Sequence, residues 1–72
     1  MNMIQAGSTV YHRPSKTEWF VMGVNEKIGR LCVTGTEPTI LLINDCELVE
    51  VGKGLTAGER RSRSAIFGPE WG

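Results

Sequence analysis

The sequence predicts a small all-β protein with five short strands, followed by a flexible C-terminal tail. Its 72 residues are enough for one domain with a modest core. Nine glycines and three prolines favour short strands joined by turns over long helices. Apolar and β-branched residues gather in five runs, and a basic, glycine-rich segment follows them.

The five predicted strands are bounded by turn residues. They cover residues 8–12, 19–25, 31–34, 40–43 and 48–51. The second strand alternates, with Phe20, Met22 and Val24 on one face and Trp19, Val21 and Gly23 on the other. A glycine inside a strand often marks a bulge or a bend, which we expect at Gly23. The predicted core consists of Phe20, Met22, Val24, Leu31, Val33, Ile40, Leu42 and Leu48.

The connections between these strands indicate how they are arranged. Residues 25–29 form a short loop in which Gly29 can adopt positive φ, and this predicts a hairpin. Residues 44–47 start with Asn and Asp, which favours a single helical turn before the last strand. Five short strands with a long first loop and a late one-turn helix are typical of an SH3-like barrel. An open antiparallel sheet remains the alternative.

Charge divides the chain into a predicted domain, residues 1–52, and a predicted tail, residues 53–72. The whole chain has no net charge, and 40% of its residues are hydrophobic, which excludes a fully disordered chain. The domain carries four basic and six acidic residues, and the tail carries four basic and two acidic residues. The small core, together with a fourth strand that is apolar on both faces, predicts a homo-oligomer.

Several kinds of site are not expected. The single histidine, His12, has no catalytic partner at a recognised spacing, so we predict no catalytic residue, no metal site and no cofactor. Cys32 and Cys46 do not form a CxxC pair, and we expect both thiols to be reduced and buried. No run of 18 apolar residues and no signal peptide are visible, which predicts a cytoplasmic protein that does not enter a membrane.

Two groups of residues are candidates for binding a partner. Tyr11 and Trp19 flank the first loop, where aromatic side chains can form a groove for a protein ligand and Glu18 can pair with a basic residue of it. The tail contains Arg60, Arg61, Arg63, Phe67 and Trp71. Such residues are typical of interfaces, so we predict that they bind a partner. The alternatives are a solvated end and a segment that packs back onto the domain.

Three segments resemble small uncharacterised proteins of bacteriophages and prophages. They are residues 10–15 (VYHRPS), 18–21 (EWFV) and 45–49 (DCELV). This chain departs from that pattern near Gly35, where an aromatic residue is usual. The resemblance implies a non-enzymatic accessory protein in the cytoplasm of a bacterial host. We expect it to bind a host protein, for example by inhibiting a host enzyme or a defence system. The alternative is a barrel that binds nucleic acid through its basic tail.

Overall fold

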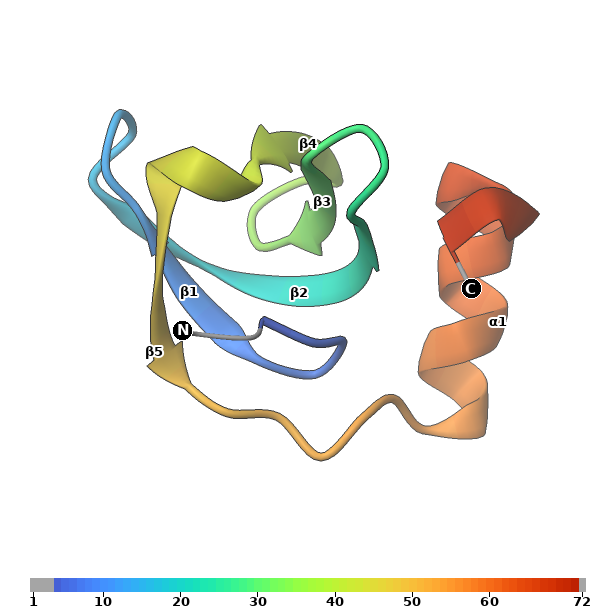
Figure 1. Ribbon diagram of the computed structural model, residues 1–72. Coiled ribbons are helices and arrows are strands. Elements are labelled where there is room, and N and C mark those ends of the chain that lie inside the picture. Colours follow the sequence, from blue (N-terminus) through green and yellow to red (C-terminus); the bar gives the residue numbers. More distant parts are fainter. Residues whose placement is uncertain (1–3, 72) are drawn as a thin grey trace.

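A computed structural model describes residues 4–71. The strands are β1 (Thr9–His12), β2 (Thr17–Asn25), β3 (Arg30–Thr34), β4 (Thr39–Leu42) and β5 (Cys46–Glu50). A 3-10 turn, η1 (Ile43–Asp45), precedes β5, and the chain continues through α1 (Ala57–Phe67) to a second turn, η2 (Pro69–Trp71) (Figure 1). The five predicted strands and the helical turn before the last strand are therefore confirmed.

The strands form one antiparallel sheet in the order β4-β3-β2-β1-β5. The nine-residue β2 lies at the centre of this order and is the longest strand. β4 and β5 are the two edges, and no ladder joins them within residues 4–71. The sheet is consequently open, and the closure expected of a barrel is not confirmed.

A bulge in β2 changes which side chains share a face. The β2–β3 register shifts between Val21 and Gly23, at the glycine that predicts a bulge. Phe20 and Met22 stay on one face, as predicted. The extra residue moves Val24 to the opposite face, where it packs against the same core cluster as Val21.

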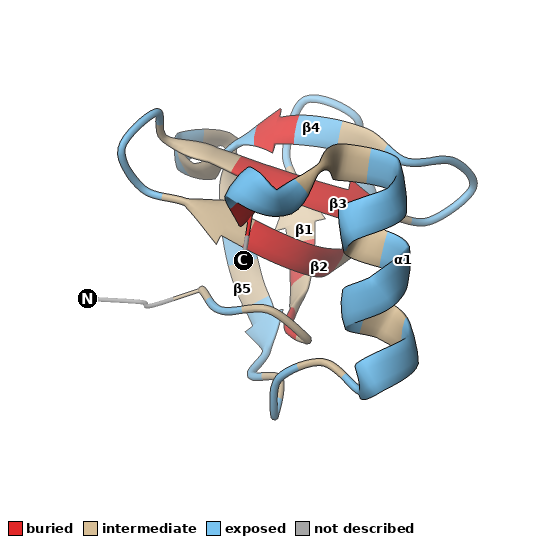
Figure 2. Cartoon of the chain, turned by 90° about the vertical axis from the view of Figure 1, so that its right-hand side faces the viewer, coloured by how far each residue is buried: buried red, intermediate tan, exposed pale blue. Residues whose placement is uncertain are grey.

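Two apolar clusters lie on the two faces of the sheet. The first is enclosed by the curled strands and consists of Val10, Val21, Leu31, Val33 and Leu41. The second lies between the sheet and the C-terminal segment and consists of Met22, Cys32 and Trp71, with Phe20, Leu55 and Phe67 packed against it. Figure 2 shows η2 in front of the buried parts of β2 and β3, with α1 beside it.

The segment that we predicted to be a flexible tail is a capped helix instead. The Thr56 hydroxyl accepts a hydrogen bond from the Glu59 N–H (3.2 Å), and a Glu59 carboxylate oxygen accepts one from the Thr56 N–H (2.9 Å). This capping box satisfies two backbone donors that would otherwise lack partners at the helix start. Gly68, at φ 95°, ends the helix. Trp71 is then only 7% exposed, so the segment packs back onto the sheet.

The predicted core is partly correct. Met22, Leu31 and Val33 are buried, whereas Phe20, Val24 and Leu48 are half-buried. The prediction was wrong for Ile40 and Leu42, whose exposed fractions are 52% and 42%. Their neighbour Leu41 is buried instead, because β4 is an edge strand that contacts the core through one face only.

Candidate functional site

The residues predicted to bind a partner do not form one surface. The β1–β2 turn and α1 lie on opposite sides of the molecule (Figure 1). Tyr11 and Trp19 are also separated, because Tyr11 pairs with Glu18 whereas Trp19 pairs with Val10. Neighbouring strand residues point to opposite faces. The structure therefore does not bring Tyr11 and Trp19 together in a groove.

Trp19 belongs to the first core cluster and to a local network in the β1–β2 turn. Its indole Nε1–H donates to the Ser15 hydroxyl oxygen (3.4 Å), which lies 2.7 Å from His12 Nδ1. The Ser15 N–H also donates to Nδ1 (3.3 Å), so Nδ1 is an acceptor and the hydroxyl donates to it. These contacts fix a tight turn. His12, Ser15 and Trp19 thus shape the β1–β2 turn.

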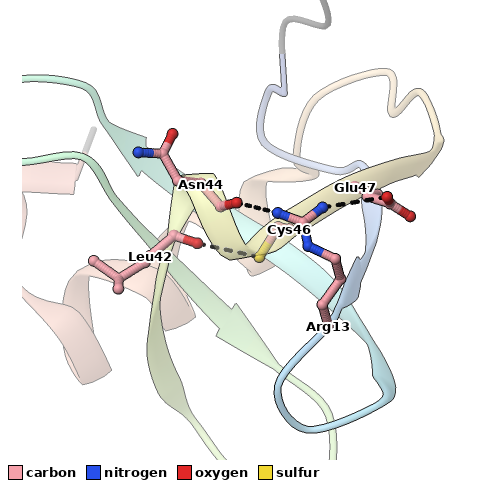
Figure 3. A network of polar contacts seen from close by, with 5 residues as sticks. All are labelled: Arg13, Leu42, Asn44, Cys46 and Glu47. Carbon is pink, nitrogen blue, oxygen red and sulfur yellow. Dashed lines mark hydrogen bonds and ion pairs between the residues drawn. The ribbon is translucent and has the colours of Figure 1, made fainter.

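Arg13 ties the same turn to the segment before β5 (Figure 3). Its guanidinium donates to the Asn44 carbonyl and pairs with the Glu47 carboxylate at 3.2 Å. Its backbone N–H donates to the Asp45 carbonyl at 2.9 Å. The side chains of Arg13 and Glu47 are 48% and 61% exposed, so water screens the ion pair and it contributes little to stability.

The sheet places an aromatic ring between carboxylates. Tyr11 on β1 pairs with Glu18 on β2 and with Glu47 on β5, so the three side chains lie in a row on one face. Glu50 pairs with Thr9, two residues along β1 and on the same face. We call Tyr11, Glu18, Glu47 and Glu50 the acidic row. Its carboxylates are exposed and Tyr11 is half-buried, an arrangement that favours binding of a cation beside the ring.

Most of the predicted tail residues hold α1 against the sheet. Arg63 is half-buried and its Nη1–H donates to the Met22 carbonyl (3.3 Å), at the bulge of β2. Phe67 is half-buried and packs edge-to-face on Trp71, with ring centroids 6.4 Å apart and planes at 64°. Arg60 and Arg61 are the two members of the predicted set on α1 that are exposed.

The two thiols differ in burial. Cys32 is buried, as predicted, and burial raises its pKa to about 11 although the Arg63 charge acts in the opposite direction. Cys46 is only half-buried; burial and the nearby Asp45 carboxylate raise its pKa. Both thiols are thus protonated at neutral pH, and a protonated thiol is a poor nucleophile and metal ligand.

Two further findings concern residues 4–71. No group of three His, Cys, Asp or Glu side chains is arranged there to hold a metal ion. No helix in this part of the chain combines the length and apolar character needed to cross a membrane. Comparisons of the chain with protein-family models, with curated proteins and with solved structures gave no match.

Proposed function

We propose that this chain is a non-enzymatic accessory protein that binds a macromolecular partner, and that the partner is a protein with an exposed basic segment. The observation that carries the proposal is the cross-strand register of the acidic row, with Tyr11 between Glu18 and Glu47. A guanidinium or ammonium group that stacks on the Tyr11 ring reaches a carboxylate on either side. Because Arg13 already forms an ion pair with Glu47, a basic group of the partner would bind mainly to the carboxylates of Glu18 and Glu50.

The resemblance to small phage and prophage proteins supports an accessory role in the cytoplasm of a bacterial host. Inhibition of a host enzyme or defence system suits a small protein whose binding surface is a rigid sheet face. We also propose that the sheet is SH3-like. The strand order, the long bulged β2 and the 3-10 turn before β5 support this arrangement.

A second candidate function is nucleic-acid binding through α1. Arg60 and Arg61 are adjacent and exposed on α1, and this helix lies on the other side of the molecule from the β1–β2 turn (Figure 1). Two arginines can contact phosphates, and binding of this kind weakens steeply as salt is added. The lack of net charge on the chain favours the protein partner.

Capture from bacterial lysate with charge-reversal variants tests the main proposal. Glu18→Lys with Glu50→Lys alters the acidic row, and Glu26→Lys with Glu37→Lys is the matched control, because all four carboxylates are exposed and the net charge changes equally. We expect the first variant to lose a nuclease-resistant protein partner that the control retains. Equal capture by both variants would contradict the assignment of the acidic row.

The same preparation distinguishes the second candidate. Fluorescence anisotropy with generic duplex DNA and single-stranded RNA, at low and moderate salt, measures phosphate binding directly. If α1 binds nucleic acid, Arg60→Ala with Arg61→Ala should abolish a salt-sensitive signal that the Glu18→Lys and Glu50→Lys variant retains. If neither nucleic acid binds at low salt, this candidate is excluded.

A further inference from the structure

β4 is one of the two edge strands of the sheet; at four residues it is short, which limits pairing, but it lacks the other features that usually protect an edge. It contains only Thr39, Ile40, Leu41 and Leu42, so no charge or proline lies within it. Its ladder with β3 runs without a bulge. Ile40 and Leu42 pair with Cys32 and Arg30, so both lie on the same face, and they are 52% and 42% exposed. Edges of this kind are templates for pairing with another strand.

The backbone of β4 also has groups that face away from β3. The Ile43 N–H donates to the Gly29 carbonyl (3.0 Å), in register with the Leu31–Leu41 pair. Hydrogen-bonded pairs alternate along an antiparallel ladder, so Leu41 bonds to β3 whereas the N–H groups of Ile40 and Leu42 point outward. No strand pairs with this side of β4 within the described residues.

The other edge strand of the sheet, β5, is charged and does not favour pairing with its own copy. β5 carries Glu47 and Glu50, and its ladder with β1 contains a register shift. Two copies of β5 side by side bring like charges together, which is unfavourable. Two copies of β4 bring only aliphatic side chains and threonine together. The β4 edge can therefore pair with β4 of a second copy, whereas two β5 edges repel each other.

We propose that two copies of this chain pair through β4 to form a two-fold symmetric dimer, independently of the acidic row. A two-fold axis through the new strand pair places each residue opposite one that points to the same face of the sheet. Because side chains alternate between the faces, this axis must pass beside a residue and not between two residues. Centring on Leu41 places Ile40 opposite Leu42 of the second copy, twice. The Leu42 N–H then donates to the Ile40 carbonyl of the second copy. The Ile40 N–H donates to the Leu42 carbonyl, which already accepts from the Cys46 thiol (3.4 Å) but has a second lone pair (Figure 3). The exposed side chains of Ile40 and Leu42 form one apolar cluster.

The size of this contact sets the expected strength. A four-residue strand pair with its neighbouring side chains covers less than the roughly 800 Å² per partner of a standard interface. We therefore expect a dimer that dissociates on dilution rather than an obligate one.

Sedimentation velocity of the full chain over a range of concentrations, from micromolar to millimolar, tests the proposal. We expect the sedimentation coefficient to rise with concentration and Ile40→Lys to keep the chain monomeric at every concentration. Ile66→Lys on α1 is the matched control, because Ile66 is 50% exposed and the same charge is added. Ile40→Thr, which keeps a strand-forming residue, should weaken the dimer without risk to folding.

Amide hydrogen exchange gives a second readout that is specific to the register. The N–H groups of Ile40 and Leu42 should exchange more slowly at high concentration, whereas those along β5 should not change. A wild-type chain that stays monomeric at millimolar concentration would overturn the proposal. So would a dimer that persists in Ile40→Lys, or protection that appears along β5 instead of β4.

Discussion

Replacing Trp71 by alanine should loosen α1 from the sheet. Trp71 is 7% exposed and packs with Met22 and Cys32, and it contacts Phe67 edge-to-face. The helix itself contacts the strands through Phe67, which packs against the same cluster, and through the hydrogen bond from Arg63 to the Met22 carbonyl. Removing the indole therefore removes most of the apolar surface that holds the C-terminal segment in place.

The expected loss is about 3 kcal/mol in the free energy of unfolding. Truncation of a buried aromatic residue to alanine usually costs roughly 3–5 kcal/mol. About 1 kcal/mol of this comes from the edge-to-face contact with Phe67. The lower end of the range applies because the second cluster has only three buried members, and α1 can settle onto the sheet to fill part of the space.

Urea unfolding monitored by circular dichroism measures this loss, and the reactivity of Cys32 reports where it occurs. In a Cys46→Ser background, Cys32 is the single thiol, and its burial beneath Trp71 protects it. Trp71→Ala should speed its reaction with a thiol reagent in the absence of urea. The control is Ile66→Ala on the same helix, which is 50% exposed and should change stability by less than about 0.5 kcal/mol.

Two outcomes would refute this reasoning. If Trp71→Ala unfolds at the same urea concentration as the wild type, Trp71 does not hold the helix. If stability falls but the Cys32 thiol stays as unreactive as before, the second cluster does not depend on the docked segment, and the burial of Cys32 has another origin.

Three further predictions concern the sheet. Leu41→Ala should lower the free energy of unfolding by about 2–5 kcal/mol, whereas Leu42→Ala should cost less than about 1 kcal/mol in urea titrations at low protein concentration. Gly23→Ala should destabilise by about 1 kcal/mol in the same titrations, because a Cβ added at this position would lie 3.0 Å from Cys32 Sγ and 3.0 Å from the Trp71 carbonyl oxygen. Burial raises the Cys32 pKa from 9.0 to about 11, so the unfolded chain loses the thiol proton at lower pH than the folded chain. The free energy of unfolding should therefore fall as pH rises from 9.0 to about 11, and Cys32→Ala should remove this part of the pH dependence.

The strands were predictable because their signals are local. β-branched and apolar runs between turn residues place each strand close to where the structure has it. Gly23 marks the bulge in β2, and Gly29 adopts φ 67° in the β2–β3 hairpin. In both positions the residue type itself carries the information, since glycine tolerates backbone shapes that other residues disfavour.

The helix α1 was missed because the face that packs toward the sheet is only half-buried and is not apolar. The residues on that face, four apart, are Glu59, Arg63 and Phe67, and only the last is hydrophobic. A test for helical periodicity of apolar residues fails on such a pattern. The signal that was present is the spacing of Thr56 and Glu59, which matches a capping box. The role of Arg63 depends on a carbonyl at the bulge, and that partner lies far away in the sequence.

The faces of β4 and β5 could not be predicted from their own residues. Residues 40–43 are all apolar, so they show no alternation, and only the pairing of Leu41 with Leu31 decides that Leu41 is buried and its neighbours are exposed. The acidic row has the same origin, because Glu47 reaches Tyr11 only through the β1–β5 ladder. Both proposed binding surfaces thus arise from the register between paired strands and not from the pattern within one strand. Substitutions that shift a register without unfolding the sheet should therefore abolish binding while leaving every exposed contact residue unchanged.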